Sequence, residues 1–232
     1  MAISLRDYQR KIVLQMLNFN TQSLDVKSKD FLDENYWSDQ WKVLIYDRTC
    51  RDIISTLFNV SQLRKQGVTL HLLIESEREP IPDVPAIYFI EQTNQNIDRI
   101  ASDLKKGLYQ SVHLNFSGKV ERAFLEELAI KTLQTGKVQV IKKVFDQHMH
   151  FISLEDNLFS LGMVDSYLSY NSPFLDDIAI QKLMDKIAKD LLSVMTSFDA
   201  VPIIRTPKAG PSQMVAEKLS KLISDHINEK RN

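Results

Sequence analysis

The sequence has little of what several common classes of protein require. Its 232 residues include one cysteine, Cys50, so no disulfide can form within the chain, as is usual in a reducing compartment such as the cytosol. Only six glycines are present, and no two are spaced for the G-x-G-x-x-G loop of dinucleotide sites. No run of about eighteen apolar residues could form a transmembrane helix. We therefore expect any contact with a membrane to be made through partners.

The chain also lacks an excess of charge of either sign. Lys and Arg total 29 and Asp and Glu total 30, which gives a formal net charge of -1 at pH 7. Without a basic excess, the composition does not favour binding to the phosphates of nucleic acid. Hydrophobic residues make up 44% of the chain, enough for a sizeable core. We expect a folded α/β protein with no nucleic-acid partner.

Short apolar runs, rich in β-branched and aromatic residues, predict four buried strands at residues 41–47, 68–74, 86–92 and 111–116. Helical patterns at residues 50–66 and 96–107 lie between them, and an amphipathic helix from Ser4 precedes them. Residues 20–40 are polar and aperiodic, as in an exposed connection. The alternation predicts an α/β fold with an open, mostly parallel sheet flanked by helices, of flavodoxin-like type.

Two further helical patterns follow, at residues 120–134 and 137–151. Because only Thr135 and Gly136 separate them, we expect two helices packed antiparallel. Beyond them, a long helix at 178–197, a strand at 201–205 and a helix from Pro211 predict the start of a second α/β unit. We therefore place a first α/β domain at residues 1–152 and the N-terminal portion of a second α/β domain at residues 153–232.

A stiff segment precedes the third predicted strand. In EREPIPDVPAIYF, residues 77–89, three prolines lack the N–H donor that a central strand needs, so Pro80, Pro82 and Pro85 must come before the strand. The residues preceding them are biased to extended conformations. This segment is predicted to be a rigid lead-in to the sheet, and therefore scaffold.

Few residues suggest chemistry. His148 and His150 are two apart on a predicted helix and point to different faces, without further ligands at metal spacing. Cys50 is better explained as a small buried hydrophobe than as a nucleophile. Residues 208–214, KAGPSQM, are the nearest approach to a phosphate loop and are better explained by a turn with Ser212 capping a helix. A nucleotide- or metabolite-binding flavodoxin-like enzyme domain is kept as the alternative function.

The predicted helix pair carries more apolar surface than one core contact requires. Leu125, Leu128 and Ala129 share a face of the first helix, and Ile141 and Val144 share a face of the second. These stripes either pack against the sheet or line an apolar groove that accepts a hydrophobic side chain of a peptide. The rim of such a groove would be acidic, formed by Glu126, Glu127 and Asp146.

Ten segments occur in an order that carries a resemblance over nearly the whole chain. Among them are WKVLIYDR, PIPDVPAIYF, LEELA, KVFDQ, FISLEDNLFSL and GPSQMVAEKL, and PIPDVPAIYF is the most specific. Together they resemble the SM family of syntaxin-binding vesicle-fusion proteins, and in particular its Sly-type branch, which acts between the endoplasmic reticulum and the Golgi. The resemblance implies a cytoplasmic protein, peripherally associated with Golgi and ER membranes, that regulates vesicle docking and fusion by binding SNAREs. It implies no enzymatic activity and no cofactor.

The resemblance also implies a site. In the Sly-type branch the outer surface of the first domain holds the extreme N-terminal peptide of a syntaxin, with a peptide Phe in an apolar pocket. By similarity this pocket falls on Leu125, Leu128, Ala129, Ile141 and Val144. A basic stretch of the peptide would match the acidic rim. We therefore expect Leu128→Lys to abolish peptide capture while leaving the fold intact.

Two features depart from the family pattern. Family members are much longer and continue into a large helical domain that contacts the SNARE bundle, so the chain is expected to be a fragment. The stretch DQHMHF, residues 146–151, also differs from the aromatic sequence that the resemblance leads us to expect at the lower edge of the groove. Both departures bear on how much of the family's activity this chain can carry alone.

Overall fold

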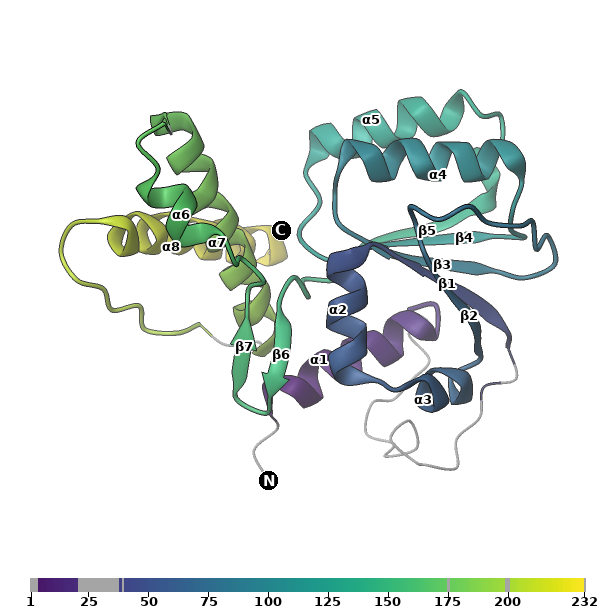
Figure 1. Cartoon of the computed structure of the whole chain (residues 1–232), viewed down its shortest axis with the longest axis horizontal. Helices are drawn as coiled ribbons and strands as arrows, with labels where there is room; N and C mark the ends of the chain where they lie inside the picture. Colours follow the sequence, from purple (N-terminus) through teal and green to yellow (C-terminus); the bar gives the residue numbers. More distant parts are fainter. Residues whose placement is uncertain (1–3, 21–37, 39, 175, 199–200, 232) are drawn as a thin grey trace.

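A five-stranded sheet forms the centre of the fold (Figure 1). The computed structural model describes residues 4–20, 38, 40–174, 176–198 and 201–231. The strands, in the spatial order β2-β1-β3-β4-β5, are all parallel to their neighbours. They are β1 (Lys42–Tyr46), β2 (Val68–Leu73), β3 (Ala86–Ile90), β4 (Val112–Phe116) and β5 (Ile141–Asp146). The predicted open parallel α/β fold is confirmed, with a fifth strand in addition to the four predicted.

Helices cover both faces of the sheet (Figure 1). One face carries α1 (Leu5–Leu17), α2 (Arg48–Leu57) and α3 (Val60–Lys65), and the other carries α4 (Asn94–Lys106) and α5 (Arg122–Leu133). Side chains of β1 alternate between the two cores: Leu44 packs with α1 and α2, whereas Val43 and Ile45 pack with α4. Because both faces are covered, β1 and β3 are apolar along most of their length.

The helical pattern at residues 50–66 forms two helices instead of one. Phe58 is extended, with φ -136° and ψ 137°, and ends α2. The Asn59 side chain then accepts a hydrogen bond from the N–H of Gln62, while the Gln62 side chain accepts one from the N–H of Asn59. This capping box starts a new helix and outweighs the continuous periodicity.

The proline segment precedes β3, as predicted, and is held by backbone hydrogen bonds on both sides. The N–H of Ile81 donates to the carbonyl of Leu108 at 2.7 Å. The carbonyl of Pro85 accepts from the N–H of Val43 at 3.0 Å. The segment contributes no side chain to the cavity or to the apolar surface described below, so scaffold is the role that its contacts support.

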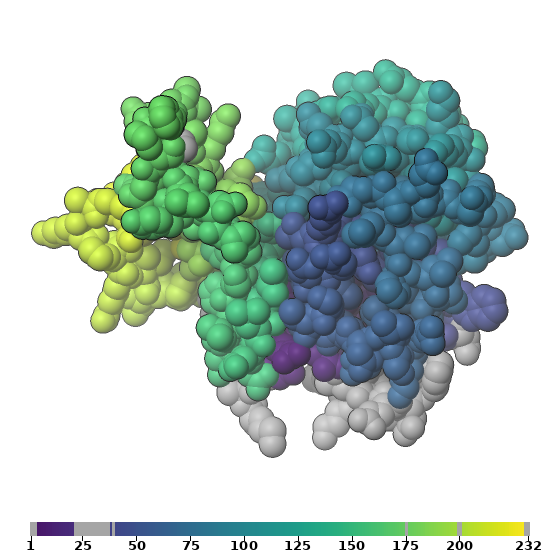
Figure 2. Space-filling view, viewed as in Figure 1, coloured from purple at the N-terminus to yellow at the C-terminus, as the bar shows by residue number. Residues whose placement is uncertain are grey.

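The rest of the chain consists of a hairpin and three helices. They are β6 (Ile152–Glu155), β7 (Leu158–Ser160), α6 (Ser166–Asn171), α7 (Asp177–Phe198) and α8 (Pro211–Arg231). The antiparallel hairpin packs on α1 and α2, and α7 packs on α8. A small core of Leu5, Phe151 and Val194 joins α7 to the N-terminal part. Figure 2 shows this helical part beside the sheet and its helices.

Two sequence predictions for this region have different outcomes. The helices expected at 178–197 and from Pro211 are present as α7 and α8. The strand expected at 201–205 is not formed, because these residues have no paired strand among the described residues.

The division at residue 152 stays a prediction. Most of the connection predicted at 20–40 lies outside the described residues. No helix in the described ranges is long and apolar enough to cross a membrane.

Candidate functional site

The prediction of a second helix at residues 137–151 is wrong. After α5 the chain makes a short 3-10 turn, η2 (Val138–Val140), and then forms β5 parallel to β4. The apolar spacing that suggested a helix belongs to β-branched residues, which favour strands, and the free edge of β4 supplies a partner. The surface predicted between two helices therefore has a strand, β5, as its second side.

A β-bulge brings two predicted site residues onto one face. In a regular strand, residues three apart face opposite sides. Here Val112 of β4 lies opposite Ile141, and Leu114, two residues further along β4, lies opposite Val144. Three residues of β5 therefore match two of β4, because Lys142 is an extra residue that forms the bulge. Since Val112 and Leu114 belong to the core beneath α4 and α5, Ile141 and Val144 both face the α5 side of the sheet.

Helix α5 presents one apolar flank towards this face. On the opposite flank, Lys131 Nζ lies 2.6 Å from Asp98 Oδ1 of α4, so the flank with Leu125 and Ala129 faces away from α4, towards β5. Leu125 and Val144 are each 40% exposed. We call the residues Leu125, Ala129, Ile141 and Val144 the α5–β5 surface. Four of the five predicted apolar site residues thus lie on the same side of the sheet, on the α5 flank that faces away from α4 and on β5.

Leu128 is the fifth, and it is not available for binding. Its side chain points at the sheet, is 3% exposed and belongs to the core with Phe116 and Val112. A lysine at this position would place a charge in the core, so the expectation that Leu128→Lys leaves the fold intact is contradicted. Helical spacing groups Leu128 with Leu125, but only the packed structure shows where the buried face ends.

The predicted acidic rim is reduced. Glu127 pairs with Lys131 at 3.0 Å on the flank that faces α4, so it cannot line the α5–β5 surface. Glu126 is exposed and pairs with Arg122 at 3.0 Å, which partly neutralises it. Asp146 ends β5 on the α5 side and is exposed. It is the predicted rim carboxylate that keeps both its place beside the surface and its exposure.

Two exposed apolar residues lie close to this surface in the chain: Leu133, which the sequence already offers as an additional apolar row of the first helix, and Val138, which the sequence analysis left out. Leu133, at the end of α5, is 62% exposed, and Val138, in η2, is also exposed. Leu133 follows Ala129 by one helical turn and so continues the same flank. The signal for Leu133 was present in the apolar periodicity, whereas nothing in the local sequence distinguishes Val138 from a core residue.

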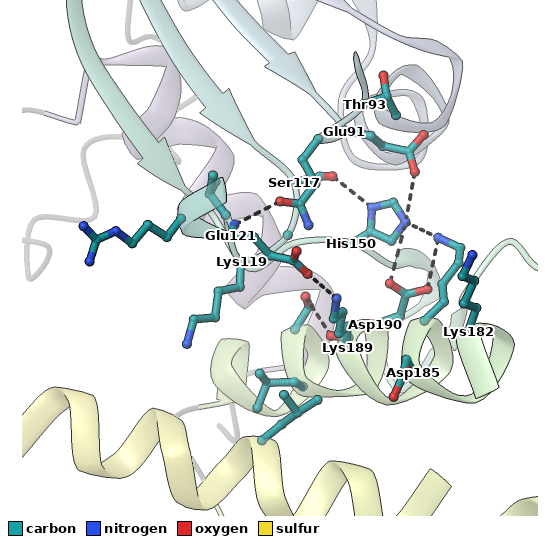
Figure 3. Close-up of a pocket in the computed structure, with 18 of the residues that line it drawn as sticks. Glu91, Thr93, Ser117, Lys119, Glu121, His150, Lys182, Asp185, Lys189 and Asp190 are labelled. Carbon is teal, nitrogen blue, oxygen red and sulfur yellow. Dashed lines mark hydrogen bonds and ion pairs between the residues drawn. The ribbon is translucent and has the colours of Figure 1, made fainter. Parts of the chain in front are cut away.

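A second candidate site is a cavity of about 790 Å³ at the carboxyl ends of β3 and β4, closed on its other side by α7 (Figure 3). Its charged side chains pair largely with one another. Lys189 of α7 pairs with Glu121, and Lys119 lies 2.6 Å from Glu229 of α8. Such pairing leaves few free cations to bind an anionic ligand.

The turn where a flavodoxin-like fold would hold a nucleotide is used for structure. Asp47, directly after β1, caps α2 by accepting from the N–H of Cys50 at 2.9 Å. Its other oxygen accepts from the N–H of Glu91 and from Asn96 Nδ2. With no glycine-rich loop here, this turn offers no cradle for a phosphate. The geometry gives no support to the alternative of a nucleotide-binding enzyme.

The other chemical candidates have structural surroundings. Burial raises the pKa of the Cys50 thiol well above its ordinary value, so the thiol stays protonated and is a poor nucleophile. His148 and His150 lie in the coil after β5 rather than on a helix. No cluster of three or more His, Cys, Asp or Glu suited to a metal ion occurs in the part of the chain that the structure describes.

The fold is α/β, and its candidate surface is apolar and formed by a helix and an edge strand. The chain belongs to the Sec1 family, whose model matches residues 42–232. It is 44% identical to the "SEC1 family transport protein SLY1" of Arabidopsis thaliana over 100% of this chain and 36% of that protein. It is 41% identical to the human "Sec1 family domain-containing protein 1" over 99% of this chain and 35% of that one.

A solved structure supports the same family membership. The "Crystal structure of Sly1p in complex with an N-terminal peptide of Sed5p" matches with a TM-score of 0.89 and 38% identity, over 99% of this chain and 40% of that chain. The predicted membership of the SM family and the similarity to Sly-type proteins are confirmed. The chain spans little more than a third of the length of the curated relatives it matches.

Proposed function

We propose that this chain acts in a SNARE-binding regulator of vesicle docking and fusion between the endoplasmic reticulum and the Golgi. Its α5–β5 surface would take the N-terminal peptide of a syntaxin-type SNARE. One observation carries the proposal: four exposed or half-exposed apolar residues of α5 and β5 share a face in a chain that is 38% identical to a Sly1p solved with an N-terminal peptide of Sed5p.

The chemistry of this surface suits a peptide with an aromatic anchor. A Phe side chain laid between Leu125 of α5 and Val144 of β5 would remove apolar area from water, which contributes about 25 cal/mol per Å². Asp146, at the end of β5, would attract a basic residue beside the anchor. Glu127 has no part in this contact, because it faces α4.

The location and wider partners follow from the same proposal. A regulator of this kind would work in the cytoplasm and reach Golgi and ER membranes peripherally, through the SNARE. Binding to an assembled SNARE complex would depend on the longer chains of which the relatives are examples. The names "SEC1 family transport protein" and "Sly1p" support this placement through family membership.

The test is a titration of the chain with a fluorescent peptide from the N-terminus of a Golgi syntaxin. We expect Leu125→Lys, which places a charge on the α5–β5 surface, to weaken binding by about thirty-fold, the effect of losing a contact worth roughly 2 kcal/mol. Val144→Lys should act alike from the strand side.

The matched control is Ile130→Lys. Ile130 lies on the same helix and is exposed, but it is outside the α5–β5 surface. It should bind the peptide like the original chain. Circular dichroism would verify folding of all three variants. Wild-type affinity in both Leu125→Lys and Val144→Lys, or equal loss in Ile130→Lys, would show that the peptide binds elsewhere.

A further inference from the structure

His150 lies buried where α7 meets the carboxyl ends of the strands (Figure 3). Its Nδ1 is 2.9 Å from Ser117 Oγ, directly after β4. Its Nε2 is 3.2 Å from Lys186 Nζ and 3.7 Å from Asp190 Oδ1, both on α7, and 3.4 Å from Glu91 Oε1, directly after β3. One imidazole therefore contacts two strand ends and the helix docked against them.

The contacts decide which nitrogen carries the proton. An ammonium group only donates, so the Nε2 that faces Lys186 must accept, and Nδ1–H then donates to Ser117. A second proton on the ring would place two cations about 3 Å apart in a poorly hydrated site. Burial, with Lys186 adding to it, lowers the pKa of His150 to about 4. The ring is neutral at physiological pH.

Asp190 has the opposite tendency. Its side chain is buried, and its Oδ2 accepts no hydrogen bond, with Lys186 Nζ 3.5 Å away. Burial, with the nearby carboxylate of Glu91 adding to it, raises the pKa of Asp190 to about 7 against the attraction of Lys186. A carboxyl group in this position holds its proton into the neutral range.

The remaining charges around the pair come from each neighbouring element. From α7 itself, Lys189 also faces Asp190, but it is engaged by Glu121 at the start of α5. From the end of β1, Asp47 faces His150 and favours its charged form, against burial and Lys186. Neither group supplies a cation that would replace Lys186 beside Asp190.

We propose that Asp190 and His150 form a one-proton latch between α7 and the carboxyl edge of the sheet. In the folded protein both side chains are uncharged: Asp190 holds the one titrating proton of the pair, and His150 is the neutral Nδ1–H tautomer. Loss of the proton from Asp190 weakens the docking of α7. In the unfolded chain at mildly acidic pH the pair also holds one proton, but on the imidazole. Folding moves the proton from the base to the acid. The uncharged pair is the form that costs least to bury.

The two groups make opposite contributions to stability. The folded-state pKa of Asp190 is raised from 3.8 to about 7, so its contribution is complete at low pH and is lost as the pH rises through 7. The folded-state pKa of His150 is lowered from 6.5 to about 4, so its contribution is present above 6.5 and is lost as the pH falls towards 4. Between about pH 4 and 6.5 the two slopes nearly cancel.

Substitution of either residue should reveal the pH dependence of stability that the other contributes, because the two contributions no longer cancel. Urea unfolding of the whole chain would be followed from pH 4.5 to 8 and compared with the unsubstituted protein. In Asp190→Asn only the contribution of His150 remains, so the stability relative to the unsubstituted protein should rise with pH. The slope should correspond to a difference of up to about one bound proton between the unfolded and folded states. In His150→Gln the Asp190 slope remains, so the relative stability should fall with pH. Slopes of the same sign in the two variants, or no change in slope, would overturn the latch.

A measurement on the unsubstituted chain does not depend on whether the variants fold. Carbon-13 NMR of the Asp190 carboxyl should show a titration midpoint near pH 7, and nitrogen-15 NMR of His150 should show the neutral Nδ1–H tautomer down to about pH 5. A carboxyl midpoint near 4 with an imidazole midpoint near 6.5 would refute the proposal.

Amide hydrogen exchange tests the mechanical part of the latch. After correction for intrinsic exchange, amides of α7 should open more readily at pH 8 than at pH 6 in the unsubstituted chain. The difference should vanish in Asp190→Asn, which cannot lose the proton. An identical pH difference in that variant would mean that Asp190 does not control the docking of α7.

Discussion

Arg78 and Asp103 form an ion pair in which the one nitrogen Nη2 donates to both carboxylate oxygens, at 2.8 Å to Oδ1 and 2.6 Å to Oδ2, with both side chains buried. The other terminal nitrogen of Arg78 donates to the carbonyls of Leu73 and Ile74 at the end of β2. Tyr88 of β3 donates its hydroxyl to the same carboxylate at 2.7 Å. The pair therefore ties the start of the proline segment to β2, β3 and α4 at once.

Removing the charge of Asp103 should destabilise the whole fold. In Asp103→Asn the guanidinium of Arg78 would remain buried without a counter-charge, which costs about 3 to 5 kcal/mol of unfolding free energy. Tyr88→Phe removes one hydrogen bond to the same carboxylate and should cost only about 1 kcal/mol. Urea unfolding followed by circular dichroism would compare the two. An Asp103→Asn variant as stable as Tyr88→Phe would argue against this role.

The bulge in β5 predicts that one lysine is dispensable. Residues 141–144 read Ile-Lys-Lys-Val, and deletion of one lysine leaves a regular strand in which Ile141 and Val144 still share a face, now two residues apart. The deletion variant should fold and keep peptide binding. Insertion of one further lysine should turn Val144 to the opposite face or force a larger bulge, and weaken binding.

The same peptide titration would compare the two length variants. Circular dichroism and thermal unfolding would establish that both are folded. If the deletion abolished binding while the insertion preserved it, the assignment of Lys142 as the extra residue would be wrong.

Lys42 gives the fold a distinct alkaline pH dependence. Its ammonium is buried and donates to the carbonyls of Leu17, at the end of α1, and of Gln66, after α3, at 3.0 and 2.8 Å. Burial lowers its folded-state pKa from 10.5 to about 8. Between these pH values the unfolded chain binds more protons, so stability should rise with pH, by up to about 3 kcal/mol.

Lys42→Met removes this titration. Urea unfolding at pH 8, 9 and 10 should show the gain in the original chain and a smaller gain, or none, in the variant. The variant should also lose the hydrogen bonds that the ammonium makes to the two helix ends. Parallel stability curves for the two proteins would mean that Lys42 titrates normally in the folded state.

Most of the sheet could be predicted from the sequence because its central strands are buried on both faces. Such strands are short, nearly continuous apolar runs, and the helices between them end at recognisable caps such as Gly107, which has φ 70°. The prolines before β3 could be placed for a similarly local reason. In each case the chemistry of neighbouring residues decides the structure.

The site was harder to predict because it depends on contacts between distant residues. The pattern Ile141-x-x-Val144 fits one helix face, and equally a bulged strand, and the partner strand β4 decides between them. Glu127 appears equivalent to Glu126 in sequence, but its place beside Lys131 depends on where α4 packs. The latch could not be foreseen, because Asp190 and His150 are forty residues apart and meet only through the docking of α7.

The position of α5 has a mechanical consequence. Its twelve residues form a rod about 18 Å long, and one turn separates Leu125, on the α5–β5 surface, from Glu121, which pairs with Lys189 of α7. A pulling force on a peptide bound at Leu125 would therefore be transmitted along α5 to its contact with α7. Because the same peptide would contact Val144 of β5, the hydrogen bonds between β4 and β5 would share that tension.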